Sequence, residues 1–252
     1  MMRRAKTAWP VGLAGGVFLL CFVGLFWVPY DPMSQAFRGS ALEGFSAGHW
    51  LGIDALGRDF GSRLWRGAGN TVAMGLAATA LTFLVSAGIL TAEQRGPARV
   101  GQLLRTATSL WVAVPVLLVA LLLLVFLGPS VQTIVLAAAL GNVPLSFRQL
   151  RTLWVHHRHA LHVEASEVLG ASTAQLFVHT LWPNLRPDLV ALARLVFAAA
   201  VLELSGLAFL GLIGDPDFPE LGSLMRQNQA FLFQRPGLVL LPGLALSGIL
   251  AV

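Results

Sequence analysis

The sequence predicts an all-α membrane protein that crosses the bilayer several times. Apolar residues make up 56% of the 252 residues and charged residues only 12%, about half the charged content of soluble domains. The apolar residues also come in long runs that lack the charged face of an amphipathic surface helix. Such runs, separated by shorter polar segments, are typical of a polytopic protein in which each run spans the membrane.

Six segments are long and apolar enough to cross, on a scale of about 20 residues per crossing. They are expected at about residues 11–30, 70–92, 107–127, 131–147, 189–213 and 236–252. The first follows Arg3, Arg4 and Lys6, as a secretion signal would. Its apolar run is longer than a typical signal core, so we interpret it as a retained helix. The sixth is close to the shortest length that can cross.

The basic residues orient this bundle. With the N-terminus in the cytoplasm, the inner segments 1–10, 93–106 and 148–188 hold ten lysines and arginines, and the outer segments hold six. This excess predicts an inside N-terminus, because cytoplasmic loops are enriched in Lys and Arg. Four of the outer arginines lie in one segment, residues 31–69, and reduce the asymmetry. The basic residues are scattered without interleaved aromatic residues, which argues against nucleic-acid binding.

The chain is expected to have two parts. Residues 1–69 would form the N-terminal helix and an extracytoplasmic loop, and residues 70–252 a five-helix core with a cytoplasmic loop at about 148–188. The outer loop contains the candidate site residues Asp54, Gly57, Arg58 and Asp59. Acidic and basic residues interspersed with glycine predict a folded loop with internal ion pairs. A gate or a docking surface for an extracytoplasmic partner is the functional alternative.

A polar segment from Glu164 to Pro183 separates two apolar runs of the inner half. Glu164 and Glu167 suit the start of a short helix, because the positive end of the helix dipole favours carboxylates there. Gly170 then permits a tight backbone turn. A short helix at a membrane face is a natural contact for a soluble partner. An interfacial amphipathic helix without a partner is the alternative.

These segments resemble the permease subunits of bacterial ABC importers, specifically the dipeptide/oligopeptide/nickel group. The outer signature of that group, Gly-Thr-Asp-x-x-Gly-Arg-Asp, is similar to residues 52–59, and its cytoplasmic EAA motif, Glu-Ala-Ala-x-x-x-Gly, is similar to residues 164–170. The group's Gly-Ala-Ser and Pro-Asn pairings also occur, at 170–172 and 183–184. Residues 209–222 are similar to the group's outer loop before the last helix. The departures from the group's pattern are Ile53, Ser166, Thr180, Trp182 and Leu221.

The resemblance implies a type I ABC importer permease fold with six transmembrane helices in the bacterial inner membrane. It implies partners as well: a second homologous permease, two cytoplasmic ATPase subunits and an extracytoplasmic substrate-binding protein. The polar segment would be the coupling helix that docks on an ATPase. The residues that it places in this contact are Glu164, Ala165, Ser166, Leu169, Gly170, Ala171, Ser172 and Pro183.

The implied function is ATP-driven import by alternating access, with peptides, nickel or a nickel chelate as the cargo. The sequence predicts no catalytic residue and no cofactor bound by this chain. Because it contains no Gly-Lys-Ser/Thr phosphate-binding loop, ATP and magnesium are expected on the partner subunits. A membrane-embedded enzyme or a scaffold without transport function is the alternative, although the only histidine outside the inner loop is His49, which disfavours a Ser/His/Asp set.

Two ionisable residues of the fifth span, Arg194 and Glu203, are candidates for lining the transport path. They are nine residues apart, so at ~100° per residue they lie on nearly opposite faces of one helix and are not expected to pair. Charges within a membrane usually face a bundle interior or an aqueous path. Arg194 is also close enough to the inner end to extend its head group to the interface.

Four histidines near the inner end, His156, His157, His159 and His162, have a spacing that suggests a metal site. We interpret them as part of a solvated basic loop and predict no metal site, because no carboxylate accompanies them before Glu164.

Overall fold

The computed structural model describes residue 16, residues 21–158, 160–168, 170, 172 and 175–251, with the backbone alone described at 162, 164, 167, 168 and 177. Its α-helices are α2 (Phe60–Arg95), α3 (Ala98–Trp111), α4 (Val116–Leu127), α5 (Val131–Arg158), α6 (Leu161–Val168), α8 (Trp182–Phe209), α9 (Leu221–Asn228) and α10 (Gly237–Leu250). Shorter helical segments are η1 (Arg38–Ser40), η2 (Leu176–Leu181, a π-helix) and η3 (Gln229–Phe231). The expected all-α class is confirmed.

Three of the expected spans correspond to single long helices, and each is longer than its apolar run. Phe60–Arg95, Val131–Arg158 and Val178–Phe209 are long and apolar enough to cross a membrane. Helix α2 begins ten residues before the expected span, at Phe60, where the Asp59 side chain accepts a hydrogen bond from the Ser62 amide at 2.7 Å. An aspartate at this position caps the unpaired amides of a helix start. The expected boundary between residues 69 and 70 therefore falls inside α2.

The third expected span, residues 107–127, is not one straight helix. The chain here forms α3 and α4, bent by 97° at a short break, which is the geometry of a broken span or of a re-entrant loop. Pro115 follows the break directly. Proline lacks an amide hydrogen and disfavours helical geometry in the residue before it, which favours a break at this point, although α5 and α8 continue through Pro144 and Pro187.

The six expected crossings are not all confirmed. The structure describes three long helices, or four crossings with the bent pair. Residues 11–15 and 17–20 of the first expected span, residues 11–30, lie outside the described residues, and residues 21–24 are helical. The sixth corresponds to α10, which has 14 residues, fewer than a typical crossing.

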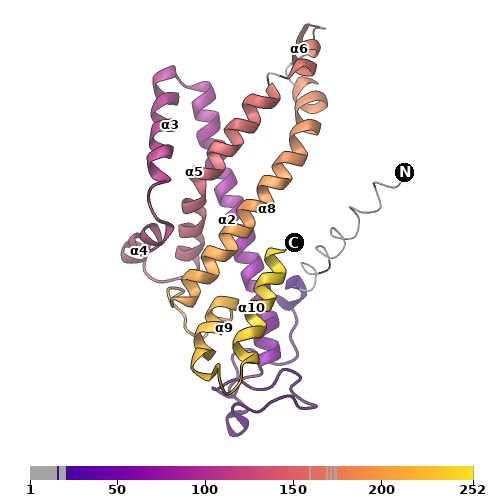
Figure 1. Cartoon of the computed structure of the whole chain (residues 1–252), viewed down its shortest axis with the longest axis vertical. Coiled ribbons are helices and arrows are strands. Elements are labelled where there is room, and N and C mark those ends of the chain that lie inside the picture. The colour runs from indigo at the N-terminus through magenta and orange to yellow at the C-terminus, as the bar shows by residue number, and fades with distance from the viewer. Residues whose placement is uncertain are drawn as a thin grey trace, which may run out of the picture.

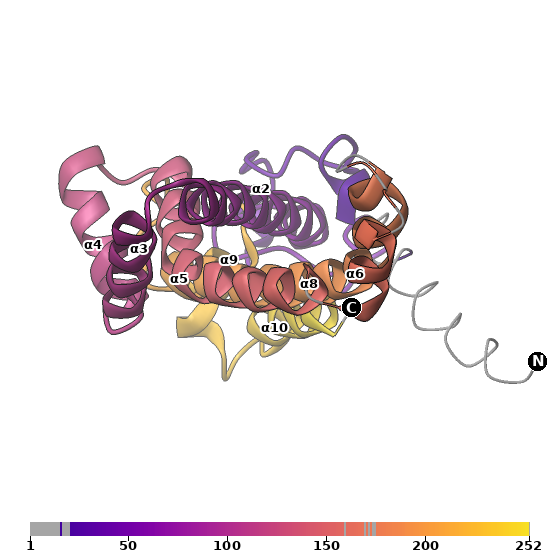
Figure 2. The ribbon, with the colours of Figure 1, turned by 90° about the horizontal axis from the view of Figure 1, so that it is seen from above.

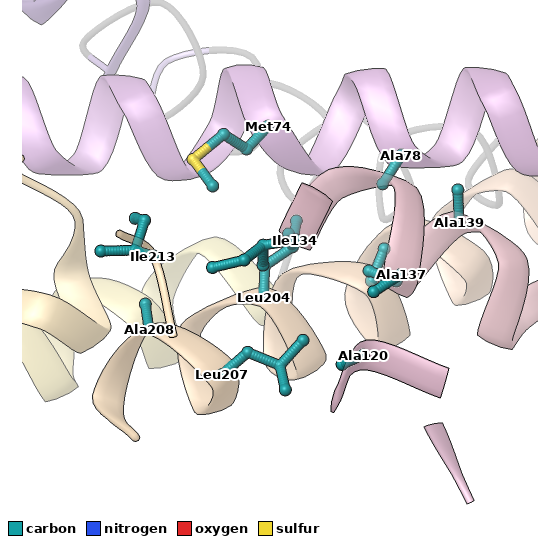
Figure 3. Close-up of a cluster of buried hydrophobic side chains, with 12 residues drawn as sticks. Met74, Ala78, Ala120, Ile134, Ala137, Ala139, Leu204, Leu207, Ala208 and Ile213 are labelled. Atoms are coloured by element: carbon teal, nitrogen blue, oxygen red, sulfur yellow. The ribbon is translucent and has the colours of Figure 1, made fainter. Parts of the chain in front are cut away.

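The helices α2, α5 and α8 form the central layer of the molecule (Figures 1 and 2). Their contact is lined by small side chains, including Ala78, Ala137, Ala139 and Ala200, each fully buried, with larger residues such as Leu204 between them (Figure 3). Small residues let helix backbones approach closely, which is how helices pack where lipid removes the hydrophobic driving force.

Hydroxyl groups reinforce this central contact. Thr82 Oγ1 donates to the carbonyl of Ala139 at 3.0 Å, and Ser86 Oγ donates to the carbonyl of Val143 at 3.2 Å. Both bonds join α2 to α5, and both hydroxyl-bearing residues are fully buried. Hydrogen bonds of this kind fix the register of two helices that otherwise present similar apolar faces.

The remaining elements lie toward the two ends of this layer (Figure 1). Helix α6 is at one end, beyond the last turns of α5. The loop before α2, together with α9 and the start of α10, is at the other. Two candidate sites predicted from the sequence, the polar segment and the outer loop, therefore lie at opposite ends of the molecule.

Candidate functional site

The polar segment forms a short helix held on one side only. Val163 of α6 is 2% exposed and packs with Leu176 and Leu181 of the following turn. Leu161, by contrast, is 83% exposed, and Ala165, one helical turn along from it, is exposed too. Residues four apart share a helix face. Helix α6 is thus anchored through Val163 and presents an open face through Leu161 and Ala165 at the end of the molecule.

Gly170 ends this helical segment. Its φ angle is +81°, and a β-carbon built on it would meet nothing within 4 Å. Glycine is therefore required here for its left-handed backbone conformation and not for lack of space. This is the conformation in which glycine most often terminates a helix.

Ser172 and Pro183 lie near the starts of the next two helical segments. The Ser172 amide donates to Gln175 Oε1 at 2.9 Å, and the Gln175 amide donates back to Ser172 Oγ at 3.4 Å. Such reciprocal bonds are a capping arrangement at a helix start. Pro183 is exposed at the second position of α8, where the π-helix η2 passes into the α-helix and a residue without an amide hydrogen interrupts the helical hydrogen bonding. Leu169, Ala171 and the Glu164 side chain lie outside the described residues.

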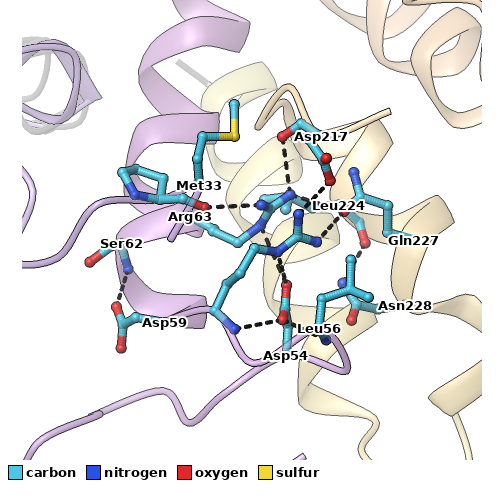
Figure 4. Close-up of polar contacts among 12 residues, drawn as sticks. Met33, Asp54, Leu56, Asp59, Ser62, Arg63, Asp217, Leu224, Gln227 and Asn228 are labelled. Atoms are coloured by element: carbon cyan, nitrogen blue, oxygen red, sulfur yellow. Dashed lines mark hydrogen bonds and ion pairs between the residues drawn. The ribbon is translucent and has the colours of Figure 1, made fainter. Parts of the chain in front are cut away.

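The outer loop folds around a buried carboxylate, Asp54, as the sequence predicted (Figure 4). Asp54 is 1% exposed; its Oδ1 accepts from the amides of Leu56 and Arg58, each at 2.9 Å, and its Oδ2 accepts from Arg58 Nε at 2.8 Å. Gly57 completes this turn with a φ of +77°, and a β-carbon there would lie 2.5 Å from the amide nitrogen of Arg38. The expected ion pair within the loop is confirmed.

The same arginine reaches beyond the loop to the segment around α9. Arg58 Nη1 lies 2.5 Å from Asp217 Oδ1, and Arg58 Nη2 donates to Gln227 Oε1 at 3.0 Å. Arg63 of α2 donates to the same Gln227 oxygen at 2.9 Å and to the carbonyl of Pro32 at 3.0 Å. We call Asp54, Arg58, Arg63, Asp217 and Gln227 the outer network. It joins the loop, α2 and α9 through two arginines that are almost fully buried.

Sequence reasoning missed three members of the outer network. Asp217 lay in a recognised segment without an assigned role, Arg63 was counted only as an outer charge, and Gln227 carried no signal at all. Asp59, which it did single out, serves the start of α2 and also pairs with His49 Nδ1 at 2.8 Å.

Glu220 is a further buried carboxyl group that the sequence did not mark. It caps the start of α9 through the Ser223 amide at 3.0 Å and accepts from Thr71 of α2 at 3.0 Å and from Ser205 of α8 at 2.5 Å. Burial raises the pKa of the Glu220 carboxyl, and these hydrogen bonds oppose the rise. Its chemistry is structural, because it joins three helices at one point.

The inner end carries ion pairs of its own. Glu93, in the last turns of α2, has a side chain that is 3% exposed and lies 2.6 Å from Arg105 Nη1 of α3 and 2.7 Å from Arg151 Nε of α5. His157 is buried and lies 2.8 Å from Asp188 of α8. The interpretation of all four histidines as solvated is therefore wrong for His157, which links two helices. His156 is exposed, and His159 and the His162 side chain lie outside the described residues.

The two ionisable residues of the fifth span face different ways. Glu203 Oε2 accepts from Asn142 Nδ2 of α5 at 2.7 Å, at the contact between α5 and α8. Arg194 is exposed. Glu203 thus takes an amide partner on the neighbouring helix, and a role of either residue in the path stays a prediction. Among the described residues no group of three or more His, Cys, Asp or Glu side chains is placed to hold a metal ion.

Comparison with known proteins places the chain among transport proteins. The model of the family described as "Binding-protein-dependent transport system inner membrane component" matches residues 84–252. The chain is 35% identical to the di/tripeptide transport system permease protein DppC of Pseudomonas aeruginosa, over 96% of this chain and 84% of that protein. It is 30% identical to the nickel transport system permease protein NikC of Escherichia coli K12, over 96% of this chain and 88% of that protein.

A solved structure confirms the fold. An inward-facing structure of the MetNI methionine ABC transporter aligns with a TM-score of 0.54 and 18% sequence identity, over 75% of this chain and 94% of that one. The multi-pass helical core agrees with these relationships. The chain belongs to the family of binding-protein-dependent transport system inner membrane components and is a multi-pass inner-membrane permease subunit of an ABC importer.

Proposed function

We propose that this permease forms half of the path of an importer for short peptides, and that it works by alternating access. Its partners would be a second homologous permease, two cytoplasmic ATPase subunits that bind ATP and magnesium, and an extracytoplasmic substrate-binding protein. The N-terminus would lie in the cytoplasm. Relatives named for di- and tripeptide transport and for nickel transport support the two cargo classes to be compared.

The observation that carries the coupling role is the open face of α6. Leu161 and Ala165 protrude at the end of the molecule, while Val163 holds the helix to the chain behind it. A small, one-sidedly anchored helix can transmit a push from a soluble partner, because its anchoring residues connect it to α5 and α8. Glu164, Ser166, Leu169, Gly170, Ala171, Ser172 and Pro183 belong to the same proposed contact.

Substitutions on the two sides of this contact test the coupling role. In the complex reconstituted with its binding protein, Ala165→Arg and Gly170→Asp are expected to abolish stimulated ATP hydrolysis, the first by blocking the open face and the second by straining the turn. His156→Arg, an equally exposed change in the last turn of α5, is the matched control and should keep stimulation. Normal stimulation in both test variants, with the complex assembled, would contradict the coupling role.

Uptake measurements distinguish the cargo classes. In a strain lacking the permease, restored uptake of labelled dipeptide, but not of labelled nickel, is expected when the chain is returned. Restored nickel uptake without dipeptide uptake would overturn the peptide assignment and leave the importer mechanism in place. Loss of both in a complex that assembles normally would contradict import itself.

A further inference from the structure

The inner half of the molecule carries two adjoining grooves with one arginine between them. The first groove, of about 610 Å³, runs between α5 and α8, and the second, of about 310 Å³, runs between α3 and α5. Arg148 and Thr152 of α5 line both grooves. We call the two together the inner groove. Its other polar lining residues are Arg105, Thr108, Ser109, Gln149, Arg151 and Asp188.

Within the inner groove, Arg148 lies on the side of α5 that faces away from α2, whereas Arg151 reaches back to Glu93 of α2. Helix α5 meets α2 at Ala139, whose carbonyl accepts from Thr82. Arg148 is nine residues further on, which at ~100° per residue places it on the opposite side of α5. Figure 2 shows α2 along one side of α5 and α8, with α3 beside α5 and α10 along the opposite side of α8.

The charged residues of the inner groove bear on what the groove faces. The groove between α5 and α8 is lined by Arg148, Gln149, Thr152 and Asp188 together with four leucines and an alanine. A charged side chain is costly against lipid tails, so charged residues of membrane helices usually face water or a protein interior. Arg148, exposed between these apolar and polar side chains, is therefore placed to meet a ligand from the aqueous side.

Arg148 is the arginine of the inner groove that is left for a ligand. Arg105 and Arg151 both lie against Glu93, and Asp188 lies against His157. Arg148 is exposed and makes no ion pair within the part of the chain that the structure describes. Three arginines against two carboxylates leave the groove with one excess positive charge when His157 is neutral.

We propose that Arg148 binds the carboxylate of the cargo at the inner mouth of the path, and that the groove thereby admits carboxylate-bearing cargo and disfavours a bare divalent cation. This assignment rests on the proposed import function and narrows its cargo class. The planar guanidinium offers paired donors that match the two oxygens of a carboxylate. The hydroxyl group of Thr152, one turn away on the same face, lies beside it in both grooves. A metal ion without such ligands meets only repulsion from Arg148.

Lipid phosphate is the competing oxyanion at this depth, because basic pockets between helices on the cytoplasmic side also bind anionic head groups. Asp188 lines the same groove as Arg148 and repels an anionic head group, which favours cargo. The test must nevertheless vary the lipid as well as the cargo.

The test uses the assembled complex in nanodiscs, without nucleotide and without the binding protein. The measured binding then reflects the permease and not the selection that the binding protein makes. Saturation-transfer difference NMR measures weak binding of Ala-Ala and of its C-terminal amide. We expect Ala-Ala to bind about tenfold more tightly than the amide, the worth of one charge-assisted contact. Arg148→Gln should remove this difference, and Arg148→Lys should keep part of it.

Arg99→Gln supplies the matched control, because Arg99 is an exposed arginine of α3 that lines neither groove. It should leave the preference for the free acid intact. Assembly of each variant is checked by size-exclusion chromatography, and each nanodisc is prepared with and without phosphatidylglycerol.

Equal binding of acid and amide in the unaltered complex, or an unchanged preference in Arg148→Gln, would overturn the assignment. A preference for Ala-Ala over its amide that appears only when phosphatidylglycerol is omitted would also overturn it. That result would mean that Arg148 binds the lipid phosphate when the lipid is present. ATP-dependent uptake by the unaltered complex, reconstituted with its binding protein in sealed proteoliposomes, separates the two proposals. Uptake without any acid preference refutes the role of Arg148 alone, and absence of uptake for every cargo refutes import.

Discussion

The arginines of the outer network show how single residues explain an anomaly in the charge pattern. Four arginines on the outer side oppose the expected inside-positive distribution, yet Arg58 and Arg63 are 1% and 0% exposed. Their charge is used inside the protein, against Asp54 and Asp217, and is not displayed at the membrane surface. Internal arginines of this kind carry little weight in the rule that orients membrane proteins by their loops.

Removal of Arg58 should destabilise the permease strongly. Arg58→Ala leaves Asp54 buried without its closest cation, and breaking a buried ion pair by removing one partner costs about 3–5 kcal/mol. Chemical unfolding of the purified permease in detergent measures the change. Arg38→Ala, an exposed arginine of the same loop, is the control and should cost less than about 0.5 kcal/mol. Equal effects of the two changes would refute the buried role.

Glu220 should make stability depend on pH in a defined direction. Its pKa is raised in the folded chain by burial. A raised folded-state pKa gives a contribution to stability that is complete below the unfolded value of about 4.3 and is lost as pH rises through the folded-state pKa. Glu220→Gln cannot titrate and should flatten this fall. The test is to measure the melting temperature of both proteins from below about pH 4.3 upward through the folded-state pKa of Glu220. Parallel plots of melting temperature against pH for the two proteins would contradict the prediction.

At the scale of the elements, the bend between α3 and α4 is the feature that composition alone did not reveal. Helix α4 is apolar throughout and the end of α3 joins it in the apolar run 107–127, which has the length of one crossing. The bend follows from the break at Val112–Val114 and the proline after it, and the buried Ala120 packs α4 against the central core. Local chain chemistry and tertiary packing therefore act together at this point.

Replacing Pro115 should open this bend. Pro115→Ala restores an amide hydrogen and removes the restriction on Val114, so helical geometry becomes accessible through the break. Spin labels at the exposed positions Leu103 and Phe126 report the angle as a distance between α3 and α4, which should increase. Pro97→Ala, at the start of α3, should leave the distance unchanged. An unchanged distance in Pro115→Ala would assign the bend to the packing of α4 alone.

The sequence predicts this fold where a feature is local, and it fails where partners are distant. Apolar runs located the second, fourth and fifth spans, but not the first turns of α2, where Arg63, Arg66 and several glycines interrupt the run. Those turns are stabilised by bonds to Pro32 and Gln227, which no spacing rule connects to them. The pair Asp54 and Arg58 is visible because it is four residues apart. The pair Arg58 and Asp217 spans 159 residues and is not.

In the polar segment, too, the local feature was predictable from the sequence and the distant contact was not. Gly170 was predictable, since a glycine after a short helix signals a left-handed turn, and its φ of +81° agrees. The anchoring of α6 through Val163 was not, because its partners Leu176 and Leu181 belong to a π-helical turn that has no clear sequence pattern.

At the scale of the whole molecule, the two ends should face opposite sides of the membrane. Phe45 is 79% exposed in the outer loop, and Leu161 is 83% exposed on α6. In a Cys21→Ser background, a cysteine at position 45 should react with a membrane-impermeant maleimide added to intact spheroplasts. A cysteine at position 161 should react only after the membrane is opened. The reverse pattern would invert the proposed orientation.

Helix α2 connects the outer network to the inner ion pairs as one uninterrupted rod. Arg63 lies in its first turn and Glu93 in its last turns, and at 1.5 Å per residue the helix from one to the other is about 45 Å long. If the outer end is the pivot, a tilt of about 10° carries the inner end through about 8 Å over that length. The permease thus contains a lever arm whose fulcrum is a cluster of buried charges. A small rotation about the outer network would therefore move the Glu93 end of α2 by the width of a side chain.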